Sequence, residues 1–300
     1  MCCLYGLMDT KQILTGAQKA KIMHALATVA EARGTDATGY ACHVNGKLMI
    51  RKQPVPGSRF LFRAQDDTVA FMGHNRFTTQ GDEKRNCNNH PFRGHIGNSD
   101  FALAHNGVLW NDKHLRERLK LPGTEIETDS YVAVQLIEQK KALDFSSLKY
   151  MAEQVEGSFT FTVLDSEDSI YIVKGGSPIC LYQYPGLGLF LYASTEEILQ
   201  DALKRVTLPR ARKKRIDISC GQIVKIDRSG TVLKSSFHSG SIVRGFCGYP
   251  YHLCVPPKPY LEELKELASM FGYSPREIER FHRNGYSAQE IEELLYSGEI

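Results

Sequence analysis

Strand-like segments dominate the middle of the chain and set its fold class. Four follow one another between residues 158 and 193: SFTFTVLD, SIYIVKG, PICLYQY and GLFLYAS. A helical pattern, STEEILQDALKRV, comes next with Ser194 or Thr195 as its cap, and the strands GQIVKIDRSG and TVLKSSFHSG follow it. Because strands cluster and helices are grouped between the clusters, the sequence predicts an α+β fold of sheets covered by helices, not a strict βαβ alternation.

Shorter elements of both kinds fill the first 143 residues. The apolar runs DTVAFMGH and DFALAHNG end in polar residues and glycine, which is typical of buried strands that deliver a loop. The other predicted elements are a helix over residues 16–34, a β-hairpin over 39–52 with Asn45-Gly46 as its turn, and helices over 111–119 and 128–143 with Asn111 and Thr128 as caps.

The composition is that of a soluble globular protein. Hydrophobic residues make up 42% and charged residues 24% of the 300, and the net charge of +3 argues neither for nor against a nucleic-acid partner. No apolar run approaches the roughly 18 residues that a membrane helix needs, and no secretory signal is visible. The eight cysteines are irregularly spaced, which indicates free thiols and a cytoplasmic protein.

Two local patterns have a second interpretation. FCGYPYHLC holds Cys247, His252 and Cys254, but a structural zinc site needs four ligands at tighter spacing, so we predict no metal. The basic run PRARKKR at residues 209–215 fits a nucleic-acid patch or a solvated loop. We interpret it as a loop between a helix and the next strand.

The chain changes character near residue 240. We expect one domain over residues 1–238, a linker rich in glycine, proline and aromatics over 239–257, and a helical module over 258–300. The repeated motifs GYSPREIE and GYSAQEIE each carry a capping box, Ser274 with Glu277 and Ser287 with Glu290. Nine Glu against five Lys or Arg give the module a net charge of −4, which favours packing or a protein contact over DNA binding.

Cysteine stands directly behind the initiator methionine. If Met1 is removed, Cys2 carries a thiol and a free α-amine on one carbon. A thiol with a pKa of about 8.5 needs a base at neutral pH, and a terminal amine with a pKa of about 7.7 to 8.0 suits that role. The position therefore allows an N-terminal nucleophile that brings its own base.

Five further motifs follow in order: RGTDATG, GHNRFTTQG, NNHPF, AHNGVLWN and ETDSY. Together with Cys2 they resemble the glutaminase domain of the class II glutamine amidotransferases, an N-terminal-nucleophile family, and most closely the glutaminase half of glucosamine-6-phosphate synthase. The resemblance runs from Cys2 to about residue 236. It implies a four-layer αββα sandwich with Cys2 at the start of a central strand, a helical appendage behind it, L-glutamine as substrate and no cofactor.

The resemblance also implies a role for each matching residue. Cys2 is the nucleophile, and Asn106 and Gly107 match the oxyanion-hole positions, where an amide N–H and a backbone N–H are suited to a developing oxyanion. The matched substrate-binding positions are Arg76 for the carboxylate, Asp129 for the α-ammonium, Arg33 near the nucleophile, and Phe77 and Thr79 in the substrate loop.

Simpler interpretations stand beside these roles. Arg33 also fits a charge at a helix C-terminus, and Asp129 fits a carboxylate in a helix first turn. We interpret His74, His90 and His105 as structural, because the mechanism already has a base. Three positions depart from the family: Cys3 replaces glycine, Phe77 replaces tryptophan and Gln80 replaces histidine. The last two predict altered substrate contacts.

No acceptor site is visible in the residues after the glutaminase-like region. The sequence is therefore consistent with an amidotransferase that hands ammonia to a separate synthase subunit, or with a free-standing amidohydrolase. Two alternatives stay open: the same nucleophile acting on another γ-glutamyl or peptide amide, and a non-catalytic regulatory module on this scaffold. The helical module fits either a partner subunit or a homo-oligomer.

Overall fold

A computed structural model describes residues 2–238, 260–286 and 288–297. Its strands form two sheets, and neighbouring strands pair antiparallel. The first sheet has the order β11-β9-β10-β1-β4-β2-β3, with β1 (Cys3–Asp9), β2 (Ala37–Val44), β3 (Lys47–Gln53), β4 (Ala70–Arg76), β9 (Cys180–Tyr184), β10 (Leu189–Ala193) and β11 (Lys214–Ile216). The second has the order β13-β12-β8-β7-β6-β5, with β5 (Phe92–Ile96), β6 (Ser99–Leu109), β7 (Gly157–Leu164), β8 (Ile170–Lys174), β12 (Gln222–Ile226) and β13 (Val232–Ser236).

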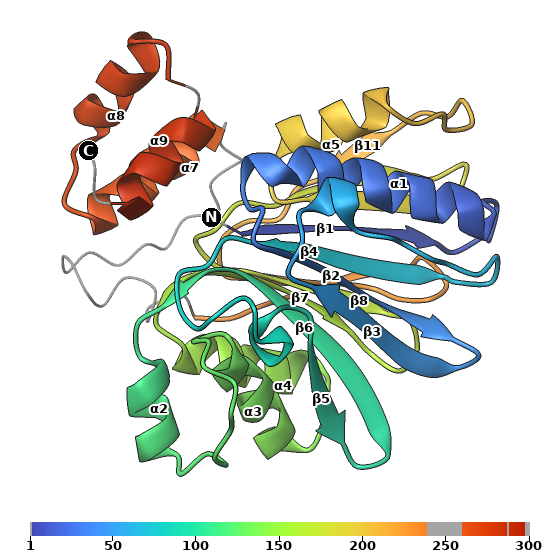
Figure 1. Ribbon diagram of the computed structural model, residues 1–300, viewed down its shortest axis with the longest axis horizontal. Helices are drawn as coiled ribbons and strands as arrows, with labels where there is room; N and C mark the ends of the chain where they lie inside the picture. The colour runs from blue at the N-terminus through green and yellow to red at the C-terminus, as the bar shows by residue number, and fades with distance from the viewer. Residues whose placement is uncertain (1, 239–259, 287, 298–300) are drawn as a thin grey trace.

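Helices cover the outer face of each sheet, so the molecule has four layers (Figure 1). The first sheet carries α1 (Gly16–Val29) and α5 (Glu196–Lys204), and the second carries α2 (Asp112–Arg118), α3 (Tyr131–Lys140) and α4 (Phe145–Gln154). One apolar cluster lies under each helical layer and a third lies between the sheets. The αββα sandwich expected from the sequence is confirmed.

Side chains on β1 alternate between two of these clusters. Leu4 and Met8 belong to the cluster between the sheets, whereas Tyr5 and Leu7 pack beneath α1. This follows from the period of two along a strand. Cys2 lies directly before β1, which has strands on both sides, so its expected place at the start of a central strand is confirmed.

Most predicted elements occur where the patterns place them. The hairpin β2–β3 turns at Asn45 and Gly46, with φ of +51° and +71°, and Thr195 is the residue that caps α5. Helix α1 gives way to a 3-10 turn at Ala30–Ala32. The predicted cap at Thr128 is wrong: α3 begins at Tyr131 after Ser130, because Asp129 is held by backbone groups outside the helix. Helix α4 was not predicted.

Two further predictions concern side-chain contacts and the basic run. Asn111 precedes α2 as expected but makes no cap bond, since its side chain spans to the backbone of Gln154 and Glu156. The basic run is exposed and mostly irregular, although its last two residues, Lys214 and Arg215, begin β11. None of the described helices is long and apolar enough to cross a membrane.

The C-terminal helical pattern forms α7 (Tyr260–Met270), α8 (Pro275–Arg283) and α9 (Ala288–Ser297). These helices share an apolar cluster of their own, which includes Leu264, Ile278 and Ile291. The capping box of Ser274 and Glu277 is present. The predicted linker with Cys247, His252 and Cys254, and the cap Ser287, lie outside the described residues. The division at residues 238 and 258 stays a prediction.

Candidate active site

Three neighbouring strands direct side chains to one end of the space between the sheets. On β4 and β6, Met72 and Ala104 belong to the inter-sheet cluster. Arg76 lies four residues after Met72 and Asn106 lies two residues after Ala104, so strand alternation directs both side chains into the same space. Cys2 stands two residues before Leu4 and takes the same direction. Strands β1 and β6 contact each other across the sheets. Residues far apart in sequence thus meet at one edge of the sandwich.

The Cys2 thiol is partly buried and donates to the carbonyl oxygen of Phe77 at 3.5 Å. Burial raises its pKa, the neighbouring Arg76 guanidinium opposes this, and Asp129 adds to it. The thiol is consequently protonated at neutral pH and needs a base before it can attack. The same interactions show that Cys2, Arg76 and Asp129 lie within electrostatic reach of one another.

Asn106 holds a fully buried carboxamide that has no hydrogen-bond partner among the described residues, on either Oδ1 or Nδ2. Burial of an unpaired amide costs about 1–3 kcal/mol. A cost of that size is tolerated at sites that gain a partner on binding a ligand. Asn106 is therefore a donor available to a substrate oxygen between the sheets.

Gly107 follows with φ of +136°, a conformation that suits glycine. A Cβ atom here would lie 2.0 Å from the carbonyl oxygen of Ser158 on β7. The close backbone approach fixes the course of β6 at the site.

Gly107→Ala is expected to lower the free energy of unfolding by at least about 2 kcal/mol, because backbone strain and the Ser158 clash add up. Urea unfolding measures this. Gly97→Ala is the matched control, since Gly97 also has positive φ (+58°) but nothing within 4 Å of its added Cβ, and should lose about 1 kcal/mol. Equal losses in the two variants would contradict the account.

Arg76 is buried at the end of β4 and is held by three hydrogen bonds. Its Nη1 donates to Asn89 Oδ1 at 2.7 Å, and its Nη2 donates to the carbonyl oxygens of Gln80 at 2.6 Å and Gly81 at 3.0 Å. A guanidinium has five N–H donors, so two remain for a ligand. A rigid, buried arginine with donors to spare is suited to a carboxylate.

Asp129 is buried and oriented by backbone amides. Its Oδ2 accepts from Leu109 N at 2.6 Å, and its Oδ1 accepts from Ser130 N at 2.7 Å. The first bond ties the loop before α3 to the end of β6, which carries Asn106. Because a carboxylate has about four acceptor sites, Asp129 retains capacity for a cationic group.

Arg33 is also buried at the site and does not act as a free charge at the end of α1. Its Nε donates to the carbonyl oxygen of Cys2 at 3.1 Å. It also forms an ion pair with Glu292 on α9. It therefore contacts the main chain of Cys2.

The predicted substrate loop begins where β4 ends. Phe77 is 49% exposed and Thr79 is exposed as well, so both side chains are accessible from solvent. Gln80 turns away: its Nε2 donates to the carbonyl oxygen of Glu127 at 2.8 Å. This hydrogen bond connects the loop after β4 to the segment that carries Asp129.

The three histidines beside the motifs form a buried, uncharged cluster. Burial lowers the pKa of His74 to about 3 and that of His105 to about 4, and it lowers the pKa of His90 well below its ordinary value. His74 bonds the carbonyl oxygen of His105 at 2.9 Å, and His90 lies 4.3 Å from the ring centres of His74 and Phe92. Their arrangement agrees with a structural role, and the described residues contain no group that could hold a metal.

This cluster predicts acid sensitivity. The folded-state pKa values lie below the unfolded value of about 6.5, so the unfolded chain takes up protons first and stability falls as the pH drops below about 6.5. His90→Phe keeps a ring between His74 and Phe92 but cannot be protonated. Its loss of stability between pH 7 and pH 5 should be smaller than that of the wild type by about 2 kcal/mol in urea unfolding. An equal loss of unfolding free energy between pH 7 and pH 5 in His90→Phe and the wild type would contradict this prediction.

Some residues of the site were missed from the sequence. Asn89 holds Arg76, and Ser130 bonds both Asp129 and His105. Asn89 lies in the NNHPF motif and Ser130 in ETDSY, so the motifs contained them without indicating what they would contact. Glu292 had no signal, because it meets Arg33 only in the folded chain.

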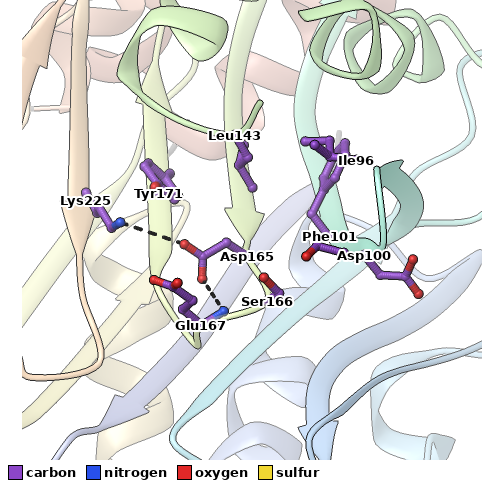
Figure 2. Close-up of a pocket in the computed structure, with 10 residues that line it drawn as sticks. Ile96, Asp100, Phe101, Leu143, Asp165, Ser166, Glu167, Tyr171 and Lys225 are labelled. Carbon is purple, nitrogen blue, oxygen red and sulfur yellow. Dashed lines mark hydrogen bonds and ion pairs between the residues drawn. The ribbon is translucent and has the colours of Figure 1, made fainter. Parts of the chain in front are cut away.

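A pocket lies at the end of β6 opposite to Asn106 (Figure 2). It is lined by residues that include Asp100, Asp165, Tyr171 and Lys225. Asp100 is six residues before Asn106 on β6, or about 20 Å along an extended strand. Asp165 is already bonded by Glu167 N at 2.9 Å and faces Lys225 at 3.8 Å. This pocket is therefore separate from the Cys2 site.

Comparison with known proteins agrees with this geometry. A family profile described as a glutamine amidotransferase domain matches residues 74–201. The chain is 30% identical to the glutamine–fructose-6-phosphate aminotransferase of Sulfolobus acidocaldarius over 198 residues, which cover 63% of this chain and 32% of the relative. The chain carries a glutamine amidotransferase domain of the class II type.

Other matches support this family and the fold. The aminotransferase of the same name from Chlamydia trachomatis is 30% identical over 63% of this chain and 30% of its own length. The glutamine phosphoribosylpyrophosphate amidotransferase of B. subtilis superposes with a TM-score of 0.62 at 18% identity, covering 80% of this chain and 50% of that one. It shares the fold of this amidotransferase. The chain spans about a third of the length of these curated relatives, all of which are named as enzymes.

Proposed function

We propose that this amidotransferase cleaves the side-chain amide of L-glutamine through a Cys2 thioester and releases glutamate and ammonia. The observation that carries the proposal is the buried, unpaired Asn106 carboxamide, which faces the space that Cys2 also faces. A donor of this kind, beside a nucleophile, is what a developing oxyanion requires. Family membership supports the assignment of glutamine.

In the proposed mechanism Met1 has been removed and the Cys2 α-amine takes the proton of the thiol. The sulfur attacks the carboxamide carbon of glutamine, and the oxyanion accepts hydrogen bonds from Asn106 Nδ2 and the Gly107 N–H. The amine then passes its proton to the departing nitrogen, and ammonia leaves. Water hydrolyses the thioester, which returns the thiol and yields glutamate.

Two buried charges give the proposed site its amino-acid specificity. The two remaining donors of Arg76 bind the α-carboxylate of glutamine, and Asp129 binds the α-ammonium. Phe77 and Thr79 contact the substrate from the loop. Because both charged side chains are buried and held in place by hydrogen bonds, a ligand that lacks either α-substituent leaves one of the charges without its ionic partner, at a cost of several kcal/mol.

The experiment that tests the function is an assay of the purified full chain with L-glutamine, measuring glutamate and ammonia in equal amounts. A γ-glutamyl dipeptide run in parallel tests the alternative substrate class. Faster turnover of the dipeptide, with none of glutamine, would overturn glutamine as substrate but retain the nucleophile. No turnover of either would favour a non-catalytic module.

The destination of the ammonia is a separate proposal. The relatives are named for transfer to fructose 6-phosphate, so this sugar phosphate is the first acceptor to test. Either a separate synthase subunit receives the ammonia, or the chain acts alone or as a homo-oligomer. Glutamine turnover that is stimulated by an acceptor together with its synthase would support transfer of ammonia to a separate subunit.

A further inference from the structure

Glu292 on α9 is fully buried although it carries a carboxylate. Its neighbours Ile291 and Leu295 belong to the apolar cluster of the helical module formed by α7, α8 and α9. Glutamate is almost never fully buried unless it is paired. Its burial therefore calls for a specific partner, and that partner lies outside the module.

The partner is Arg33, which is 259 residues away in sequence. Arg33 Nη1 contacts Glu292 Oε2, and Arg33 Nη2 donates to Glu292 Oε1 at 3.2 Å, so the pair is bidentate. The exposed fractions of the two side chains are 1% and 0%. The module lies at the end of the sandwich where β1 begins (Figure 1). The ion pair thus seats α9 next to the Cys2 site.

The same guanidinium also contacts the nucleophile's peptide. Arg33 Nε donates to the carbonyl oxygen of Cys2 at 3.1 Å while both Nη atoms face Glu292. A guanidinium is planar and its donors are fixed relative to one another. A group that orients the two Nη atoms therefore also orients Nε, so the Glu292 carboxylate on α9 contributes to how the Cys2 carbonyl is held.

We propose that Glu292 is a positioning residue for Cys2, and that docking of the helical module completes the active site through the chain Glu292, Arg33, Cys2. In this proposal Glu292 acts through Arg33. Its carboxylate holds the Arg33 guanidinium in one orientation. The guanidinium in turn donates a hydrogen bond to the Cys2 carbonyl oxygen, just before β1 starts. The kinetic part of this inference rests on the proposed glutaminase function, whereas the coupling between α9 and Cys2 does not.

The kinetic test compares Glu292→Gln with a matched control in the same module. Gln keeps the shape but not the charge, so kcat is expected to fall about tenfold or more, since a small displacement of a nucleophile is costly, while KM stays within about threefold. Glu279→Gln removes the exposed ion pair with Lys265, 2.7 Å long and internal to the module, and should leave both constants unchanged. An unchanged kcat in Glu292→Gln would overturn the proposal.

A second variant separates positioning from folding. Arg33→Lys keeps the charge but loses the planar guanidinium that contacts Glu292 and Cys2 at the same time. It is expected to lower kcat as Glu292→Gln does. Because the two residues act through one contact, the double variant should lose no more activity than the worse single variant. Losses that multiply would show independent effects and contradict the proposed chain.

A readout without substrate distinguishes failure of this inference from failure of the glutaminase assignment. Hydrogen exchange, resolved by peptide, should become faster in Glu292→Gln both in α9 and in the peptide that starts at Cys2, with α3 and α4 unchanged. Faster exchange in α9 alone would overturn the coupling. If the wild type does not turn over glutamine, the proposed function fails and this measurement alone decides the coupling.

Discussion

Cys2→Ala is expected to abolish glutamine hydrolysis, with kcat falling at least about 10⁴-fold, because the thioester cannot form without the sulfur. The assay is release of glutamate from L-glutamine by the purified chain. Affinity for glutamine should persist, since Arg76 and Asp129 bind its α-carboxylate and α-ammonium groups. Isothermal titration of the inactive variant with glutamine checks that separation.

The matched control is Cys3→Ala. Cys3 is the neighbouring thiol, but it is fully buried and belongs to the cluster beneath α1, on the opposite side of β1 from the space between the sheets. Activity should therefore stay within a few-fold of the wild type. Loss of activity in Cys3→Ala equal to that in Cys2→Ala would contradict the assignment of the nucleophile.

Asn106→Leu is expected to lower kcat by about 10²–10³-fold while leaving stability unchanged or higher. The carboxamide has no partner among the described residues, so an apolar side chain of similar shape removes an unpaired polar group and breaks no native hydrogen bond. Steady-state kinetics and urea unfolding of the same preparation measure both quantities.

Asn75→Leu is the control that gives this result meaning. Asn75 is equally buried but accepts from Tyr5 Oη at 2.8 Å and donates to the carbonyl oxygens of Ala27 at 2.9 Å and Gly34 at 3.1 Å. Leu leaves all three unpaired, so a loss of about 3 kcal/mol or more in unfolding free energy is expected. If Asn106→Leu is as destabilising as Asn75→Leu, the Asn106 amide is structural and not an oxyanion donor.

Much of the fold could be predicted because its signals are local. The hairpin at Asn45-Gly46 and the buried runs that became β4 and β6 depend on turn chemistry and on periodicity within a few residues. The order of strands in each sheet could not be predicted this way. Pairing of β1 with β4 and β10 joins segments up to about 190 residues apart, and only the packing of whole sheets selects it.

The candidate site shows the same division. Motif order and resemblance supplied Cys2, Arg76, Asn106 and Asp129, and strand alternation directs the first three to one end of the sandwich. The errors arose where a side chain had competing partners. Thr128 fits a helix cap, yet α3 starts later because Asp129 is tied to Leu109. The contact of Arg33 with Glu292 has no local signal at all.

The central claim is that Cys2, with its own α-amine free, is the nucleophile toward glutamine. Intact-mass spectrometry of the full chain, before and after reaction with an electrophilic glutamine analogue, tests it most directly. The account predicts a mass that lacks Met1 and a single adduct that peptide mapping assigns to Cys2, with labelling slowed by L-glutamine. A mass that retains Met1, or an adduct on another cysteine while Cys2 stays unmodified, would contradict it.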